Sequence, residues 1–444
     1  MVFNVIALLI LLYSFINLKK GFVLYLMFQI VGLTSTVFLK FGSVNITIGM
    51  FMDLFYLFAY CCKHNRFKSI VFPWRRPFFV IFFSWILTCF FSVAGFVGEF
   101  TRACSNLLQD IVFIWLIWKM IDTRKDLLLL IKGMTVTFFV TSLYGLYEYI
   151  AKTNPIVNYK STLVDGGITL YANTVEAAAR GYRMISFMEH PIGAGMTFAL
   201  FVTFVLVSNL CYREKYTKNY KIFTVFVLVL CILCVILSKM RSPLVFLFIA
   251  TLGVVDFRKI KFYKLLLICL VGTVAIMPFM GNYINIFLGI FSEKASTKIG
   301  GSSIEQRLSQ LSAVWHLMLM SPIGGLGEKF KNFISNQYTR AALSYESVWF
   351  EQMVKHGIVG VIANVYLAYY TVIKIPRIYK SRQAFFLGLA YWITYSLTSI
   401  PAFRVSLFYL LLFYFIKKSD VYKEELVKAN NKTRVFGTVK FKIE

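Results

Sequence analysis

Charged residues are scarce in this chain, and acidic residues are the scarcest of them. Of the 444 residues only 15% are charged, with 20 acidic residues against 47 basic ones. Hydrophobic residues make up 59% of the chain, and its mean hydropathy is +0.70. A water-soluble protein with so few charges cannot cover its own surface. The composition therefore excludes a soluble globular protein and predicts that the lipid bilayer is the solvent.

Cysteine is absent from the long polar loops, which excludes a disulfide framework there. All eight cysteines lie in or at the ends of apolar stretches. Cys231 and Cys234 have a CxxC spacing, but no second ligand pair accompanies them, so packing is favoured over zinc binding or redox chemistry. The polar loops also lack an Asp-x-Asp motif and any cluster of histidines with carboxylates. We therefore expect no metal and no other cofactor.

Apolar stretches long enough to cross a bilayer recur along the chain. They lie at residues 2–18, 21–39, 44–62, 78–98, 103–121, 127–149, 188–211, 221–237, 242–257, 263–281, 347–372, 384–400 and 402–416. These stretches predict an all-α polytopic membrane protein with about 12–13 transmembrane helices. The first does not resemble a cleaved signal peptide, because Lys19 and Lys20 follow it instead of preceding it.

Basic residues are distributed unevenly between the two sides of the predicted bundle. The short loops on one side carry 21 Lys or Arg residues, and the alternate short loops carry five. By the positive-inside rule, the N-terminus lies outside and the C-terminus inside. Segment 417–444 is then a basic cytoplasmic tail, which we expect to lie on anionic lipid headgroups. Membrane topology thus explains most of the net charge of +27, and we expect no nucleic-acid partner.

This topology divides the chain into membrane regions and two long external loops. The transmembrane regions are 1–149, 188–281 and 347–416, and the loops are 150–187 and 282–346. Long loops are translocated regardless of their charge, so the basic residues in these two loops are compatible with an external position.

The second external loop has the pattern of an amphipathic helix. Ser302 and Glu305 have the spacing of a capping box. Apolar residues follow one helical face, with Arg307, Gln310 and Val314 on a neighbouring stripe; the apolar set is Ile304, Leu308, Leu311, Trp315 and Met318. We expect a helix that lies on the membrane surface or packs over the bundle and ends at the glycine-rich turn 322–327.

Four charged residues fall on the outer side without being required by the topology. They are Arg183, Arg241, Arg307 and Glu346. The planar guanidinium of arginine suits bidentate contact with phosphate. Arginines that converge with one carboxylate at a membrane surface predict a site for a lipid-linked diphosphate.

These residues belong to an ordered set of motifs between about residues 180 and 375. The motifs are Arg183-Met-Ile-Ser-Phe-Met-Glu-His190-Pro191, Ser238-Lys-Met-Arg241-Ser, Glu305-Gln-Arg307, Pro322-Ile-Gly-Gly-Leu-Gly327, and Glu346-Ser347 followed by Gly357-Ile-Val-Gly360. In this set the chain resembles the superfamily of Wzy-type polysaccharide polymerases and O-antigen ligases. Ligases usually carry His-Asn where this chain has Glu346-Ser347, whereas a glutamate there is familiar among polymerases. The resemblance therefore favours a polymerase.

The resemblance implies a GT-C-like enzyme that builds O-antigen or capsule polysaccharide at the outer face of the bacterial plasma membrane. Its substrates would be oligosaccharide repeat units joined through diphosphate to a polyprenol such as undecaprenol. The growing glycan would move from its lipid diphosphate to the non-reducing end of a fresh lipid-linked unit. Membrane lipids surround such an enzyme, and a flippase and a chain-length regulator are its candidate protein partners.

On this basis each candidate residue receives a role. Arg183, Arg241 and Arg307 would bind the diphosphate leaving group, and Glu346 would accept the proton of the attacking hydroxyl in a metal-independent inverting displacement. Arg307 is counted with Glu346 as catalytic, because it would neutralise the departing charge. Three residues are second-rank candidates, namely Arg180, His190 and Arg340.

Plainer roles remain open for the same residues. Arg183 and Arg241 could each anchor a span at the level of the lipid headgroups. Arg307 could form an ion pair with Glu305, and Glu346 could cap the helix that starts after it. His190, which precedes a proline, suits the start of a helix.

Other functions also remain open. The nearest is a ligase that attaches finished glycan to another acceptor. A transporter or flippase of lipid-linked sugars would instead use Asp53 and Asp110, since acids inside apolar stretches are costly. A hydrogen-bonded structural pair, with Asn106 or Gln109 as partners, is the other interpretation of these two acids.

Overall fold

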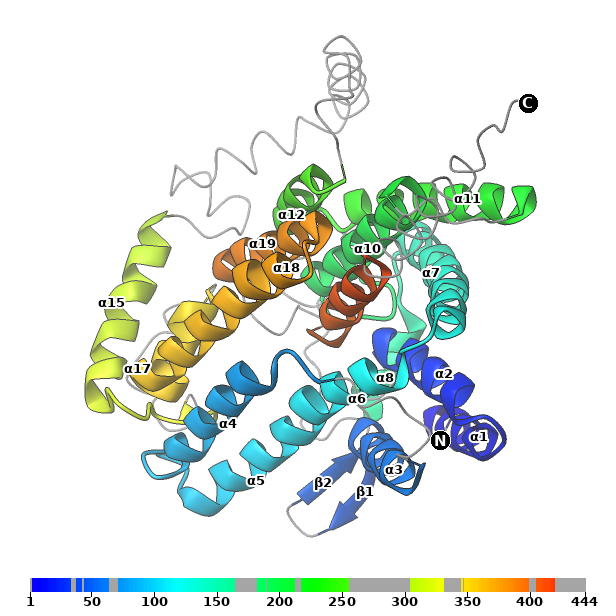
Figure 1. Ribbon diagram of the computed structural model, residues 1–444. Coiled ribbons are helices and arrows are strands. Elements are labelled where there is room, and N and C mark those ends of the chain that lie inside the picture. Colours follow the sequence, from blue (N-terminus) through cyan, green and yellow to red (C-terminus); the bar gives the residue numbers. More distant parts are fainter. Residues whose placement is uncertain are drawn as a thin grey trace, which may run out of the picture.

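The computed structural model describes residues 2–32, 37–41, 44–63, 71–163, 182–188, 190–211, 217–254, 304–330, 345, 347–398 and 405–419. Of these residues 82% are helical, and Figure 1 shows their helices gathered into a bundle. The predicted all-α polytopic architecture is therefore confirmed. The predicted span 263–281 and the tail beyond residue 419 lie outside the described residues.

The N-terminal elements are helices and one pair of strands. They are α1 (Val2–Ile16), α2 (Leu18–Ile30), β1 (Val37–Phe41), β2 (Val44–Thr47), α3 (Ile48–Lys63), α4 (Arg75–Cys89), α5 (Phe96–Asn106), η2 (Leu107–Val112), α6 (Phe113–Met120), α7 (Arg124–Ala151) and α8 (Pro155–Leu163). Local sequence explains where the longest begins. Thr123 accepts a hydrogen bond from the amide of Asp126, whose carboxylate accepts one from the amide of Thr123, so a capping box starts α7.

The C-terminal elements include two of the predicted site residues, Arg241 and Arg307. They are α10 (Pro191–Leu206), η4 (Val207–Cys211), α11 (Lys218–Leu237), α12 (Arg241–Leu252), α15 (Ile304–Met320), α17 (Val348–Tyr369), η5 (Tyr370–Lys374), α18 (Ile375–Ile378) and α19 (Arg382–Leu397). A last helix covers residues 405–419.

Five continuous helical segments within the described residues are long and apolar enough to cross a membrane. They are Phe96–Met120, Arg124–Ala151, Pro191–Leu210, Lys218–Leu237 and Val348–Ile378. Every predicted apolar stretch that the structure describes contains a helix, but several are shorter than the roughly 20 residues that a straight span needs. The chain is a multi-pass membrane protein.

The predicted span 21–39 is wrong as a single helix. α2 ends at Ile30, and β1 and β2 form an antiparallel hairpin in which Lys40 faces Asn45. Gly32 adopts a φ of +75°, which ends the helix, and β-branched residues such as Val37 and Val44 favour extended backbone. Hydropathy alone did not distinguish this apolar hairpin from a helix.

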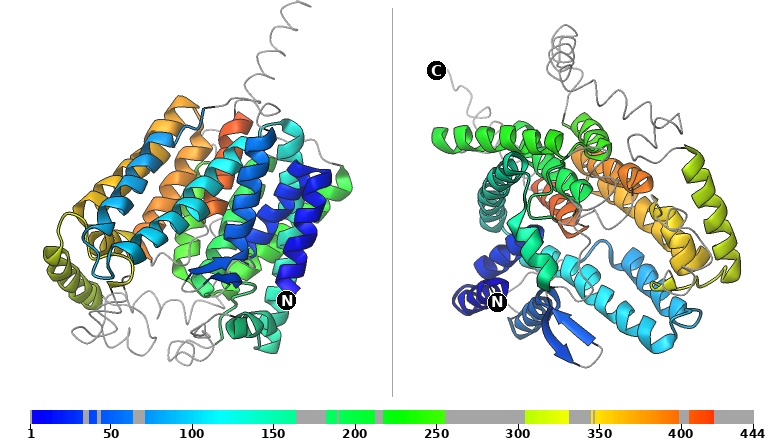
Figure 2. Two further views of the ribbon diagram at one scale, coloured as in Figure 1. Left: turned by 90° about the horizontal axis from the view of Figure 1, so that it is seen from below. Right: turned by 180° about the vertical axis from the view of Figure 1, so that it is seen from behind.

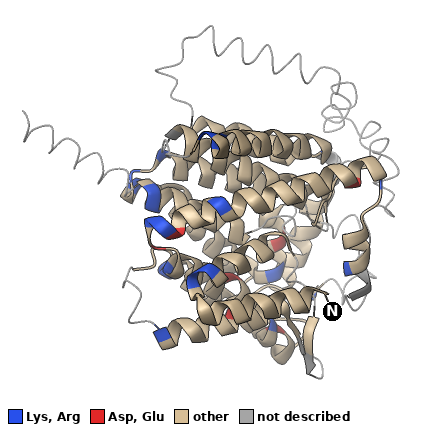
Figure 3. Ribbon diagram, turned by 90° about the vertical axis from the view of Figure 1, so that its right-hand side faces the viewer, with Lys and Arg blue, Asp and Glu red and all other residues tan. Residues whose placement is uncertain are grey.

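The ends of the helices form two opposite surfaces, and one of them is the basic end. Lys19, near the start of α2, forms ion pairs with Asp122 (2.6 Å) and Asp126 (2.7 Å) near the start of α7. Lys417, near the end of the last helix, donates to the carbonyl of Trp118 at 2.6 Å. Figure 3 shows many of the lysines and arginines toward this end. It is the surface that the positive-inside rule assigns to the cytoplasm.

The opposite surface is the site end, where α10, α12 and α17 begin and α19 ends. Arg382 at the start of α19 donates to the carbonyl of Leu252 at the end of α12 (2.8 Å), so these two helices are antiparallel. Trp349 in the first turn of α17 donates to Ser396 near the end of α19 (2.7 Å). Gly195 in α10 packs closely against Pro243 in α12. In Figure 2 (left), the long helices run side by side and α15 crosses them at a steep angle.

Candidate functional site

The turn between α11 and α12 brings two of the predicted arginines together. Lys239 has a φ of +51°, a left-handed conformation that is uncommon for residues other than glycine, and Arg241 is the first residue of α12. Arg183 packs against this turn and is only 1% exposed. Its Nη1 donates to Sδ of Met240 at 3.2 Å. Arg183 therefore contacts the residue that directly precedes Arg241.

Several positive charges gather at this turn. Burial lowers the pKa of the Lys239 ammonium, and the neighbouring charges of Arg183 and Lys152 lower it further. Lys152 follows α7 directly and is also left-handed, with a φ of +53°. The ammonium of Lys239 lies 5.8 Å from the centre of the Tyr149 ring. Cations held together against their mutual repulsion create a positive potential that suits an anionic ligand.

The segment 182–188, which carries Arg183, is fastened to three neighbouring elements. The amide of Met184 donates to the carbonyl of Leu237 at the end of α11 (3.2 Å). The hydroxyl of Ser186 donates to the carbonyl of Thr141 in α7 (2.8 Å). Lys160 in α8 donates to the carbonyl of Phe187 (2.8 Å). Because these bonds hold the residues that directly follow Arg183, they fix its segment relative to α7, α8 and α11.

The third predicted arginine comes from a different element at the same end. Arg307 lies in the first turn of α15, and its Nη2 approaches the carbonyl of Leu397 at 3.4 Å. Leu397 is the last residue of α19, and α19 ends beside the start of α12, where Arg241 lies. The structure therefore brings Arg183, Arg241 and Arg307 to the site end.

α15 is present where the sequence predicts it, and its two stripes have opposite surroundings. The predicted apolar face is exposed, with Leu308 at 59% and Trp315 at 53%. The neighbouring stripe is buried instead, and Gln310, Val314 and Leu317 are each 0% exposed. Val314 and Leu317 belong to a small core formed with residues of α17. An apolar helix face that points outward is favourable in a bilayer. The neighbouring stripe, which mixes polar and apolar residues, therefore packs against the rest of the protein.

α17 begins with a side-chain cap. Ser347 Oγ accepts a hydrogen bond from the amide of Trp349 at 3.3 Å. Glu346, the predicted base, precedes this cap and lies outside the described residues. Arg180 and Arg340 also lie outside them. Among the second-rank residues His190 is described, and it caps α10, its Nδ1 accepting from the amide of Ile192 at 3.2 Å.

The glycine-rich motifs of the two C-terminal segments dock into each other. α17 is broken at Gly357, whose φ is +61° and ψ −158°. The amides of Leu326 and Gly327 donate to the carbonyls of Val354 (2.8 Å) and Lys355 (3.0 Å) at this break. A Cβ at Gly357 would meet the carbonyl of Ile323. The 322–327 turn is thus more than a helix terminator, because it supplies hydrogen bonds that α17 cannot make within itself.

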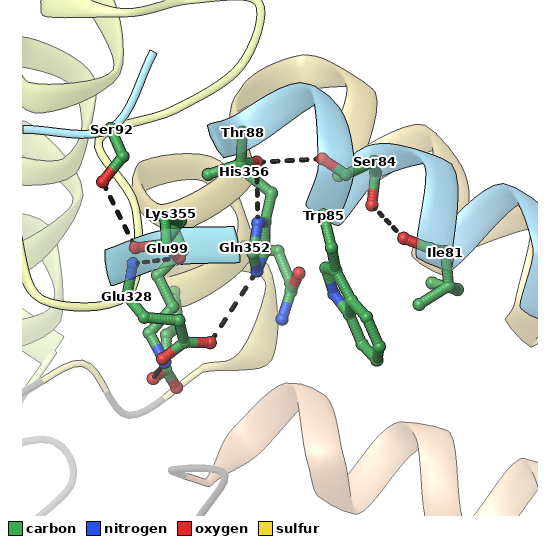
Figure 4. Close-up of polar contacts among 12 residues, drawn as sticks. Ile81, Ser84, Trp85, Thr88, Ser92, Glu99, Glu328, Gln352, Lys355 and His356 are labelled. Atoms are coloured by element: carbon green, nitrogen blue, oxygen red, sulfur yellow. Dashed lines mark hydrogen bonds and ion pairs between the residues drawn. The ribbon is translucent and has the colours of Figure 1, made fainter. Parts of the chain in front are cut away.

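Beside this docked turn lies a polar network that the sequence analysis missed (Figure 4). Lys355 forms ion pairs with Glu328 (2.6 Å) and Glu351 (2.5 Å). Nδ1 of His356 is hydrogen-bonded to Thr88 in α4 at 2.9 Å. Burial alone would raise the pKa of the Glu328 carboxyl, but the charge of Lys355 holds it below its ordinary value.

The network extends from α17 to α5. Glu99, which is buried in α5, accepts a hydrogen bond from the amide of Glu328 at 3.0 Å. Its other oxygen accepts one from the hydroxyl of Ser92 at 3.2 Å. The contacts join residues up to 268 positions apart in the sequence. The available sequence signal was the presence of charged residues such as Glu99 and Lys355 in helices of a largely apolar chain.

The two intramembrane acids have different surroundings. Asp53 is fully buried and accepts a hydrogen bond from the hydroxyl of Tyr25 at 2.7 Å. Its partner is therefore neither Asn106 nor Gln109. Asp110 lies in η2, a stretch of π-helix within the span Phe96–Met120. The Tyr25 contact supports a structural role for Asp53.

The comparison with protein families identifies the region that carries most of the motifs. Residues 226–365 match the O-antigen ligase family. This match is consistent with the O-antigen ligase/polymerase superfamily, so the resemblance is confirmed. The matched segment includes Arg241, Arg307, the 322–327 turn and the α17 break. A comparison with curated proteins finds no match.

The O-antigen ligase family supports membrane glycan processing with lipid-linked glycan substrates. It implies a membrane enzyme of the glycosyltransferase kind. The segment that carries Arg183 and His190 precedes the matched region. Its connection to the site rests on the contacts of Arg183 and Met184 with the α11–α12 turn.

Proposed function

We propose that this protein polymerises polyprenyl-diphosphate-linked oligosaccharide repeat units into surface polysaccharide. The observation that carries the proposal is the common position of Arg183, Arg241 and Arg307 at one end of the bundle, next to the start of α17. The family match supports the same class of substrate. The uneven distribution of basic residues supports an orientation with the site end outside a bacterial plasma membrane.

The proposed chemistry is an inverting displacement. The hydroxyl at the non-reducing end of the acceptor unit attacks the anomeric carbon of the growing glycan, and its proton passes to the Glu346 carboxylate. The bond from the anomeric carbon to the diphosphate oxygen breaks, and polyprenyl diphosphate leaves. Arg183, Arg241 and Arg307 neutralise the charge that develops on this leaving group. The planar guanidinium of each arginine can donate two hydrogen bonds to one phosphate group.

The Arg183 side chain must change its contacts before it can bind the diphosphate. Its guanidinium is 1% exposed and donates to Sδ of Met240. A thioether is a weak acceptor compared with a phosphate oxygen, so a diphosphate would compete for this donor. The side chain then turns toward Arg241 without any movement of its anchored backbone.

A ligase is the second candidate, and the description of the matched family favours it. A ligase and a polymerase would use the same diphosphate contacts and differ in the acceptor. The Glu346-Ser347 pair, in place of the His-Asn that ligases usually carry, favours the polymerase.

The deciding experiment supplies purified protein in lipid vesicles with lipid-linked repeat units as the only glycan. A ladder of longer glycans that remain on the polyprenyl diphosphate supports polymerisation. Transfer to a separate added acceptor, with no ladder, would replace the proposal with the ligase. Movement of labelled lipid-linked sugar across the vesicle without any new glycosidic bond would instead indicate the transporter.

A further inference from the structure

Glu148 occupies a buried position in the last turn of α7, directly behind the segment that carries Arg183. Its side chain is 0% exposed, and both carboxylate oxygens accept hydrogen bonds. Oε1 accepts from the hydroxyl of Tyr182 at 2.9 Å and from the amide of Ile185 at 3.0 Å. Oε2 accepts from the amide of Ser186 at 2.5 Å. The three donors flank Arg183 on both sides.

We propose that Glu148 is a positioning residue for Arg183. The inference rests on the proposed role of Arg183 in binding the diphosphate. Tyr182 immediately precedes Arg183 and Ile185 follows two residues later, so one carboxylate holds a side chain before the arginine and the backbone after it. This bracing directs the guanidinium toward Met240 and the start of α12.

The three donors all need acceptor atoms, which the two oxygens of the Glu148 side chain supply. An ionised carboxylate only accepts hydrogen bonds, whereas glutamine would present an NH2 group to at least one of these donors. A buried donor left without an acceptor is costly, so the segment would shift to satisfy it. Ser186 adds a further constraint, because its φ of +51° is a strained conformation that persists only while the surrounding contacts enforce it.

The test compares Glu148→Gln, Arg183→Lys and the double variant in the reconstituted polymerisation assay. We expect Glu148→Gln to raise the KM for the lipid-linked donor about tenfold, with kcat within about twofold, because ligand contact weakens while the proton acceptor is unchanged. Inorganic pyrophosphate should inhibit this variant more weakly than wild type by a similar factor. If Glu148 acts through Arg183, the double variant should be no worse than Arg183→Lys alone.

Two further variants separate positioning from general damage. Tyr182→Phe removes one of the three hydrogen bonds and should raise the KM by only a few fold. Asp126→Asn is the matched control, since Asp126 is a buried, hydrogen-bonded carboxylate at the opposite end of α7. It should leave the KM unchanged even if it lowers the melting temperature.

The outcomes are distinguishable from a failure of the proposed function itself. If Arg183→Lys polymerises normally, the diphosphate role of Arg183 is wrong. If Arg183→Lys is impaired but Glu148→Gln has a normal KM, only the positioning role is overturned. Additive losses in the double variant, or an equal KM effect from Asp126→Asn, would likewise overturn positioning and identify Glu148 as a stability residue.

Discussion

At the scale of single residues, the structure brings arginines from three separate segments to one end of the bundle. Arg183 is held by the 182–188 segment, Arg241 opens α12, and Arg307 lies in the first turn of α15. Arg307 lies in a separate helix, whereas the Arg183 segment is hydrogen-bonded to the end of α11, next to the turn that leads to Arg241. A substitution at Arg307 should therefore leave the other two arginines in place.

Replacing each arginine with lysine tests whether the planar fork is needed. Arg307→Lys keeps the charge but loses bidentate geometry, so we expect a loss of about 10- to 150-fold in kcat/KM, equivalent to roughly 1.5–3 kcal/mol. Arg183→Lys and Arg241→Lys should behave similarly. The measurement is the length and yield of the polymer ladder in a deletion strain, with protein abundance checked by blot.

Asp53→Asn is the contrast to the arginine variants. Asp53 is buried beside Tyr25, so its substitution should reduce abundance or melting temperature more than polymer formation. Normal polymer from all three lysine variants, together with loss of product from Asp53→Asn at normal abundance, would favour the transporter.

Glu346→Gln separates a proton acceptor from a helix cap. Glutamine keeps the shape and hydrogen bonding of the side chain but does not accept a proton, so turnover should fall by about 10² or more while the lipid-linked substrate still binds. The measurements are single-turnover rate and substrate affinity on the same preparation. Near-wild-type turnover would make Glu346 a cap and return the search for the base to other carboxylates.

The lowered pKa of Glu328 predicts that the stability of the protein depends on pH. Its pKa in the folded protein is below the ordinary value of 4.5, so the unfolded chain binds the proton more readily. The stabilisation is therefore complete above about pH 4.5 and is lost as the pH falls through the lower folded pKa. Wild type should melt above Glu328→Gln at pH 7, and this difference should shrink below about pH 4.5. A difference that stays constant down to pH 3 would contradict the ion pair with Lys355.

At the scale of elements, the sequence predicted helices better than contacts. Runs of apolar residues are local, so the stretch 127–149 predicts α7 to within a few residues of its ends. The β1–β2 hairpin was missed because an apolar strand and an apolar helix have the same hydropathy. The Glu328–Lys355 pair and the Glu148 contacts were missed because they depend on three-dimensional packing between distant segments.

The break in α17 gives the element-scale prediction. Gly357→Ala places a Cβ at a φ of +61° and against the carbonyl of Ile323, so it should destabilise the protein by about 1–3 kcal/mol. Gly98→Ala is the matched control, because a Cβ at Gly98 in α5 has no neighbour within 4 Å. It should be neutral or slightly stabilising. The measurement is the melting temperature in detergent, and equal melting of both variants would show that the break is unimportant.

At the scale of the whole molecule, the two ends of the bundle differ in their charge and in their contacts. The basic end gathers Lys19, Lys417 and their partners, whereas the site end gathers the three arginines and the docked 322–327 turn. The positive-inside rule predicts that the site end faces outward.

Cysteine labelling tests this direction. Cysteines introduced at Ser161 and Asn332 should react with an impermeant maleimide in intact cells, because both belong to the predicted external loops. A cysteine at Lys68 should react only after lysis, since its loop carries several of the basic residues assigned to the cytoplasm. Protection of 161 and 332, with reaction at 68, would invert the orientation and remove the proposed external site.

The docking of the 322–327 turn into α17 also decides which part of the chain is interchangeable between related proteins. Backbone carbonyls exposed by the Gly357 break receive their hydrogen bonds from Leu326 and Gly327, and a helix in a membrane cannot leave such groups bare. An external loop exchanged alone would present a foreign turn to these carbonyls. An exchange of this loop between related proteins should therefore preserve folding only if α17, as far as Gly360, is exchanged with it.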